Sequence, residues 1–124
     1  MKNNFVEAKG NVVAKPVVRM TQNGTKVATF TIAVNRPNPK NKDEKLTDFI
    51  DFVAWGDSAD VCEKHLDKGT YAYANGRLNK RNYDDKDGKK VYVTEVFMEE
   101  IWLAPPKEQK EENGSIFDDS ELPF

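Results

Sequence analysis

The sequence predicts an all-β domain with one short helix, and three observations support this prediction. Residues 27–35 alternate between two faces, one of them fully apolar, which is the period-two pattern of a strand. Asn-Gly at 23–24 and Asp-Gly at 87–88 each separate strand-like segments, as hairpin turns do. Helical spacing of apolar residues occurs between residues 56 and 69. The expected order is therefore five strands, with the helix between the third and the fourth.

The first expected strand runs from about Phe5 to Met20 and is interrupted by Gly10 and Pro16. Since glycine within a strand often marks a tight bend, we expect Gly10 to permit one. The second strand is residues 27–35. The other three are expected over 47–55, 71–79 and 90–103.

The third strand places different side chains on its two faces. One face carries Ile50, Phe52 and Ala54, and the other carries Phe49, Asp51, Val53 and Trp55. If the first set fills the core, then the aromatic residues of the second set point outward.

The expected helix follows this strand directly. Asp57 or Ser58 is expected to cap it and Gly69 to end it. Its apolar stripe is formed by Val61, Cys62, His65 and Leu66. We expect His65 to be packed in this stripe and Cys62 to be a small buried hydrophobic residue.

This order of elements is that of an OB-fold, a small Greek-key barrel whose exposed face binds oligonucleotides or oligosaccharides. Topology alone does not choose between these ligands. After Leu103, a charged stretch without periodicity begins at Ala104. We therefore expect one OB-fold domain over residues 1–104, followed over residues 105–124 by a disordered linker and an acidic tip.

Composition narrows the classes of protein further. The chain has 124 residues and lacks an apolar run near the ~18 residues of a membrane span. Its start enters a patterned segment rather than a signal peptide, so we expect a cytoplasmic protein without a membrane partner. With one cysteine and one histidine, an internal disulfide is excluded and a zinc or iron cluster is not expected. We expect neither a metal nor another cofactor.

The formal net charge of −2 conceals an uneven distribution. Residues 1–104 hold 17 Lys and Arg against 15 Asp and Glu, whereas residues 105–124 hold 2 against 6. The body is mildly basic and the end is acidic. An excess of this size does not establish a polyanion ligand, so such a ligand must be argued from the positions of the basic residues.

An enzyme is not expected. Asp48 and Asp51 lie three apart on a strand and so point to opposite faces, and Asp84, Asp85 and Asp87 belong to a polar hairpin tip. The sequence shows neither a nucleophile–base pair nor a phosphate-cradling glycine loop.

Aromatic and basic residues are interleaved outside the expected core. Phe49 and Trp55 lie about 20 Å apart on one outward face, and bases stacking on them would explain their exposure. Tyr83 is expected in the loop between the last two strands, just after Arg77, Lys80 and Arg81. These cations would meet phosphates while a base stacks on the tyrosine ring. A subunit interface, helix packing or an ordinary solvated hairpin tip remain alternative explanations.

The loop from Arg36 to Lys45 is also net basic, and it is expected to guide a polyanionic backbone. Its basic residues are Arg36, Lys40, Lys42 and Lys45.

The last seven residues set an acidic run before an apolar end. The tip comprises Asp118, Asp119, Ser120, Glu121, Leu122, Pro123 and Phe124. We expect the apolar residues to enter a pocket of a partner protein, while the acids pair with basic residues at its rim. An ordinary acidic terminus is the alternative.

With these residues together, the chain resembles the bacterial and phage single-stranded DNA-binding proteins over nearly its whole length. The resemblance is carried by Gly10-Asn11, Pro16, Arg19, Asn23-Gly24, the segment 30–36, Lys68-Gly69, the segment 76–78, the segment 91–96 and Leu122-Pro123-Phe124.

The resemblance implies that Phe49, Trp55 and Tyr83 are base-stacking residues. A further stacking position of the family falls at Asn38, which offers no aromatic platform. The basic residues expected to contact the DNA backbone are Arg19, Arg36, Arg77, Lys80, Arg81, Lys89 and Lys90.

The resemblance also implies a function. A family member coats single-stranded DNA with little sequence preference, commonly as a homotetramer, and recruits replication, recombination and repair proteins through its tip. The short, charged linker suggests a phage, plasmid or accessory relative, acting in the bacterial cytoplasm or nucleoid. An RNA-binding OB-fold module and an OB-fold protein-interaction adaptor remain the alternatives.

Overall fold

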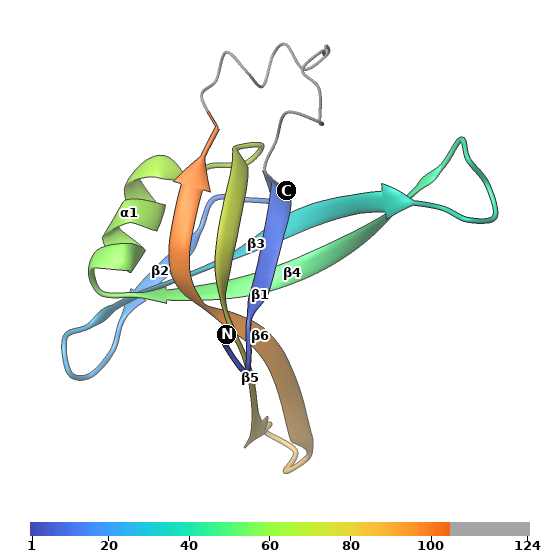
Figure 1. Ribbon diagram of the computed structural model, residues 1–124. Coiled ribbons are helices and arrows are strands. Elements are labelled where there is room, and N and C mark those ends of the chain that lie inside the picture. The colour runs from blue at the N-terminus through green and yellow to red at the C-terminus, as the bar shows by residue number, and fades with distance from the viewer. Residues whose placement is uncertain (105–124) are drawn as a thin grey trace.

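The computed structural model describes residues 1–104 as a β-barrel with one helix (Figure 1). The elements in chain order are β1 (Val6–Val12), β2 (Val17–Met20), β3 (Lys26–Pro37), β4 (Lys45–Trp55), α1 (Asp57–His65), β5 (Tyr71–Asp84) and β6 (Lys90–Leu103). β1 and β2 are the two parts of the first expected strand. The predicted OB-fold, a five-stranded barrel with a helix between its third and fourth strands, is therefore confirmed. The expected linker and tip, residues 105–124, lie outside the described residues.

Two pairings between distant parts of the chain close the barrel. β1 pairs antiparallel with β5 from Val6 to Asn11 and then passes to β3, where Asn11 and Val12 lie opposite Ala33 and Ile32. β4 and β6 run parallel where residues 52 and 53 meet residues 96 and 97. All the remaining pairings are antiparallel.

Gly10 stands where β1 changes partners. A Cβ added to Gly10 would lie 2.0 Å from the carbonyl oxygen of Ala33, which is far inside van der Waals contact. Glycine is required here because the two backbones approach so closely. The bend expected at Gly10 is thus a crossing point between two sheet partners.

Two hairpins extend beyond the barrel as long arms (Figure 1). β3 and β4 pair continuously as far as Pro37 and Lys45, and β5 and β6 as far as Asp84 and Lys90. Tyr83 was expected in a loop, and that expectation is wrong, because Tyr83 lies in β5 opposite Val91. Ladder hydrogen bonds and cross-strand side-chain pairs continue the hairpin beyond the part that faces the core.

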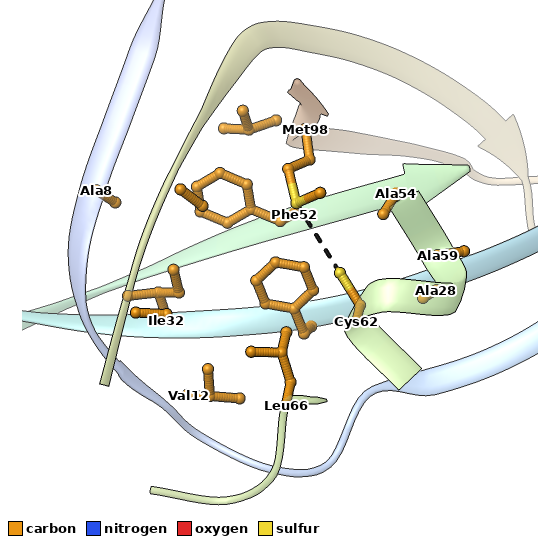
Figure 2. Packing of buried hydrophobic residues seen from close by; sticks show 14 residues of the cluster. Ala8, Val12, Ala28, Ile32, Phe52, Ala54, Ala59, Cys62, Leu66 and Met98 are labelled. Carbon is orange, nitrogen blue, oxygen red and sulfur yellow. Dashed lines mark hydrogen bonds between the residues drawn. The ribbon is translucent and has the colours of Figure 1, made fainter. Parts of the chain in front are cut away.

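The core fills the barrel and extends to the inner side of α1 (Figure 2). Phe30 and Phe52 stack in parallel, with their ring centroids 5.3 Å apart. Cys62 of α1 is fully buried and lies 3.9 Å, sulfur to sulfur, from Met98 of β6. Burial raises the pKa of the Cys62 thiol to about 11, so the thiol stays protonated at neutral pH.

The helix differs from its expected form in three ways. It begins after Gly56, whose φ is +61°, and no side chain caps it. It ends at His65, before Gly69. His65 is exposed rather than packed, and Val61 is also exposed. A helix of nine residues laid across one end of a barrel buries only a narrow stripe, which is Ala59, Cys62 and the following Leu66.

Lys26 fastens the helix to the start of β3. Its Nζ lies 2.7 Å from an oxygen of Asp60 and 2.5 Å from an oxygen of Glu63. The hydrogen bond and the charge of Lys26 lower the pKa of the Asp60 carboxyl. Both ion pairs are partly open to solvent, so they orient the helix more than they stabilise the fold.

Candidate nucleic-acid interface

A band of aromatic and basic residues crosses the outer face of the barrel. Arg19 of β2 lies opposite Val27 of β3, and Val27 lies opposite Trp55 of β4. Trp55 is 44% exposed even though its neighbours Val53 and Val27 are buried. Both valines lie beside Trp55 on the same face of the sheet, so the indole extends an apolar surface that is partly open to solvent.

Trp55 is joined to the next strands through Phe97 of β6. The two rings meet edge to face, with centroids 5.9 Å apart and an interplanar angle of 73°. The guanidinium carbon of Arg77, from β5, lies 4.8 Å from the centroid of Phe97, within cation–π range. Trp55, Phe97 and Arg77 thus form a continuous patch over three strands, here called the central patch.

The band continues along the β5–β6 arm. The Nε of Arg81 donates a hydrogen bond of 2.9 Å to the carboxylate of Glu95. Glu95 is only 7% exposed, and its hydrogen bond and charge raise the pKa of Arg81. The guanidinium carbon of Arg81 also lies 5.9 Å from the ring centroid of Tyr83. Tyr83 is 49% exposed, so an open aromatic ring stands beside a cation held in place by Glu95.

Phe49 is the third expected stacking residue and lies on the other arm. It is 62% exposed and sits opposite Ala33 of β3. The small partner leaves the phenyl ring without a cross-strand neighbour of its own size. Phe49 and Trp55 lie on the same face of β4 because they are six residues apart.

A cavity of about 320 Å³ lies between the β1–β2 connection and the outer face of β3 and β4. The backbone N–H of Val13 donates to the carbonyl of Thr31, 2.9 Å away, and holds the start of the connection beside the edge of β3. Glu95 and Asp51 also line the cavity. Its position beside the central patch makes it part of the same face.

Not all of the expected basic residues lie on this face. Lys80 alternates with Arg81 along β5, so the two point to opposite sides of the arm. Lys90 lies opposite Asp84, on the side of Lys80, and Lys89 belongs to the turn. The structure therefore groups Arg19, Arg77 and Arg81 and leaves the three lysines at the edge or on the back of the β5–β6 arm.

Arg36, expected to contact the DNA backbone, lies on the other side of the β3–β4 arm from Phe49. It follows Val34 on the side of β3 that continues the core face, and its Nε lies 2.7 Å from Asp48. The hydrogen bond and the charge of Asp48 raise the pKa of Arg36. Phe49 lies on the opposite side of the same arm, one residue from Asp48.

Asn38 begins the loop between β3 and β4. Its side-chain oxygen accepts a hydrogen bond of 2.9 Å from the backbone N–H of Lys40. The side chain thus closes a tight turn, a usual role for asparagine in loops. Such a turn gives Asn38 a structural role at this position in place of stacking.

Two members of the interface were missed from the sequence, namely Phe97 and Glu95. Their signal was present, because Val96 and Met98 occupy core positions and their odd-numbered neighbours must then point outward. Phe97 connects Trp55 to Arg77, and Glu95 anchors Arg81.

Within residues 1–104, no three His, Cys, Asp or Glu side chains gather in a way that could hold a metal ion. In the same part of the chain, no helix is long and apolar enough to cross a membrane.

A model of the single-strand binding protein family matches residues 3–104, which is the whole barrel. The chain belongs to this family. Among its relatives, a single-stranded DNA-binding protein of Bacillus cereus is 43% identical over 114 residues, covering 91% of this chain and 67% of the relative. That of Halalkalibacterium halodurans is 38% identical over 115 residues, covering 93% and 68%. Single-stranded DNA-binding protein 1 of Staphylococcus aureus is 38% identical over 108 residues, covering 87% and 69%.

A solved structure of a family member shares this fold. It is described as a Plasmodium falciparum SSB in complex with single-stranded DNA, and it superposes with a TM-score of 0.73 at 25% identity. The match covers 85% of this chain and 97% of the other. The resemblance stated from the sequence is thereby confirmed.

Proposed function

We propose that this single-strand binding protein family member binds single-stranded DNA by stacking bases on exposed aromatic rings. The observation that carries the proposal is the central patch, in which Trp55 is exposed, braced by Phe97 and continued by Arg77. Tyr83 and Phe49 extend the platform along the two arms. The names of the relatives and of the solved neighbour agree with this ligand.

Stacking explains why such binding depends little on sequence. Every base has a π-face, and each base stacked on an aromatic ring contributes about 1–3 kcal/mol as measured by alanine substitution. In a duplex the bases stack on one another and pair, so their faces are not available to Trp55. The face should therefore select single strands over duplex.

The arginines contribute charge beside the rings. Arg19 and Arg77 flank the central patch and Arg81 stands beside Tyr83. Each neutralised phosphate changes the slope of log affinity against log salt by roughly −0.7 on a single strand. Binding should weaken with salt, but stacking should leave a component that salt does not remove.

We further propose the wider role that the resemblance implies. The protein would protect single-stranded DNA during replication, recombination and repair in the bacterial cytoplasm or nucleoid, without enzymatic activity of its own. Like the family, it would act as a homotetramer. Sedimentation or small-angle scattering would test this, and a monomer would contradict it.

The acidic tip, residues 118–124, would recruit replication, recombination and repair proteins. Its deletion should abolish their capture and leave DNA affinity equal or slightly higher, because an acidic segment competes with DNA for basic residues. Loss of DNA binding on deletion would contradict this division of labour.

A fluorescence anisotropy titration with labelled oligo(dT), duplex DNA and oligo(U) tests the proposed ligand. We expect tight binding of oligo(dT) and weak binding of duplex. Binding of oligo(U) should be weaker than binding of oligo(dT). Preference for oligo(U) would favour the RNA-binding alternative, in which the 2′-hydroxyl is recognised. Binding of no nucleic acid would favour a protein-interaction adaptor.

A further inference from the structure

The cavity beside the central patch has a polar end that accepts hydrogen bonds. Thr31 and Asp51 lie directly opposite each other on β3 and β4. The Thr31 hydroxyl donates to Asp51 Oδ1 at 2.6 Å, so it is not available to donate to a ligand. Within residues 1–104, Asp51 forms no ion pair with a lysine or arginine. Asp51 is exposed and lines the cavity, so its carboxylate is an acceptor there.

The rest of the cavity is mainly apolar. Its apolar lining includes Val53 of β4, Val13 of the connection and Val17 of β2. Glu95 also lines the cavity, but its charge is paired with Arg81. A volume of about 320 Å³ with apolar walls and one unpaired carboxylate suits a flat, neutral group that donates hydrogen bonds.

A DNA strand can offer this cavity either a phosphate or a base. A phosphate would be repelled by the carboxylate of Asp51, because two negative charges would approach each other. A base is neutral and has an apolar face. Lys15 also lines the cavity and is placed to meet a phosphate flanking such a base.

The bases differ in what they offer to a carboxylate. Cytosine carries an exocyclic amino group, which Asp and Glu are known to accept in nucleic-acid recognition. Thymine and uracil carry a carbonyl oxygen at that position, and their single ring N–H lies between two carbonyl oxygens. A carboxylate therefore meets a donor on cytosine and acceptors on thymine.

The location of Asp51 places it on the path of the strand. It lies on the outward face of β4, two residues from Phe49 and four residues from Trp55. At about 3.3 Å per residue, these spacings are roughly 7 and 13 Å. A strand that stacks on both rings and follows this face of β4 passes Asp51, which lies between them.

We propose that the cavity is a base subsite in which Asp51 accepts a hydrogen bond from the exocyclic amino group of cytosine. A strand seated there then favours cytosine over thymine or uracil. The inference rests on the proposed binding of single-stranded DNA and adds to it. The stacking platforms remain indifferent to sequence, and the preference is confined to one subsite among several.

The test compares oligo(dC) with oligo(dU) of equal length, at one salt concentration and at neutral or mildly alkaline pH. Both have a pyrimidine ring without a methyl group, and they differ in the groups on the pairing edge. The variants are Asp51→Asn and Asp51→Ser, with Asp57→Asn as the control. Asp57 is an exposed residue at the start of α1 that does not line the cavity.

The readout is the ratio of the two affinities within each variant, because removing a negative charge strengthens binding to both oligonucleotides. We expect Asp51→Ser to lower the preference for oligo(dC) by about three- to ten-fold, the scale of one base-edge hydrogen bond. Asp51→Asn keeps a carbonyl oxygen and should lower it less. Asp57→Asn should leave the ratio unchanged.

The proposed subsite would be overturned if the ratio of the affinities for oligo(dC) and oligo(dU) were the same in the wild type, Asp51→Asn and Asp51→Ser. Thermal melting checks that each variant is folded, and two different substitutions keep the test decisive if one of them is not. Failure of the wild type to bind either oligonucleotide would instead contradict the proposed function. Tight binding of both, with a ratio independent of Asp51, would contradict the subsite alone.

Discussion

Replacing Trp55 by alanine tests the stacking platform directly. The substitution removes the indole that is 44% exposed and leaves the buried neighbours Val53 and Val27 in place. We expect weaker binding of single-stranded DNA from a protein that remains folded.

The magnitude follows from the contacts of the ring. Loss of one stacked base costs about 1–3 kcal/mol, or roughly a 5- to 150-fold rise in Kd. Phe97 loses its edge-to-face partner at 5.9 Å, which costs about 0.5–1.5 kcal/mol of stability. Affinity and stability should thus both fall, and affinity should fall more.

Trp102 provides a matched control. It is 54% exposed and contacts Tyr73, with ring centroids 5.1 Å apart, away from the central patch. Trp102→Ala also removes an exposed indole in contact with another ring, but it removes no part of the proposed DNA site. We expect its affinity for oligo(dT) to equal that of the wild type.

The assay is anisotropy of a labelled oligo(dT), which does not depend on protein tryptophan. Thermal melting and sedimentation establish that each variant is folded at the assay temperature and assembles as the wild type does. An affinity of Trp55→Ala within two-fold of the wild type would refute the reasoning. So would an equal loss in both tryptophan variants.

Three further tests concern the fold around the site. Gly10→Ala should lower the free energy of unfolding in urea by about 2–4 kcal/mol, because the added Cβ would meet the Ala33 carbonyl. The control Gly24→Ala, at an open turn with positive φ, should cost about 1–2 kcal/mol. Equal effects of the two substitutions would contradict the close backbone approach at Gly10. Arg81→Leu leaves the buried Glu95 carboxylate without its partner and should cost about 1–2 kcal/mol. The added substitution Glu95→Gln should recover part of that loss, and no recovery would be evidence against the pair. Cys62 should react with iodoacetamide only after unfolding, because its thiol is buried and its pKa is raised to about 11. Rapid labelling of the native protein would contradict the burial. Because the folded protein holds the thiol proton more tightly than the unfolded chain, this proton's contribution to the free energy of unfolding is fully present below the unfolded pKa of 9.0. The contribution is lost as the pH rises through about 11.

The barrel was predictable from the sequence because its core obeys a two-residue period. Phe52 and Ala54 alternate with outward residues on β4 and are buried as expected. The same alternation predicted the exposure of Phe49 and Trp55. Local pattern is sufficient wherever one face of a strand packs on the core.

The errors concern places where the pattern carries less information. The outer end of β5, residues 80–84, carries charged or polar side chains on both faces, so neither periodicity nor a breaker marks where this strand ends. Tyr83 was therefore expected in a loop. Likewise, helical spacing around Cys62 does not reveal how much of a short helix the barrel covers, and His65 was wrongly expected to be packed.

The cavity and the central patch could not be predicted from local sequence. The cavity depends on the β1–β2 connection lying beside Thr31. The patch depends on the parallel contact of β4 with β6, which brings Phe97 beside Trp55. Both arise from contacts between residues far apart in the chain, and these are fixed only when the barrel closes.

The measurement that tests the central claim most directly uses the Trp102→Phe variant, in which Trp55 is the remaining tryptophan of the chain. Its intrinsic fluorescence is followed during titration with oligo(dT) at two salt concentrations, with duplex DNA as competitor. We predict strong quenching that duplex does not reverse and that persists in part at the higher salt. Absence of quenching, or equal displacement by duplex, would contradict base stacking on Trp55.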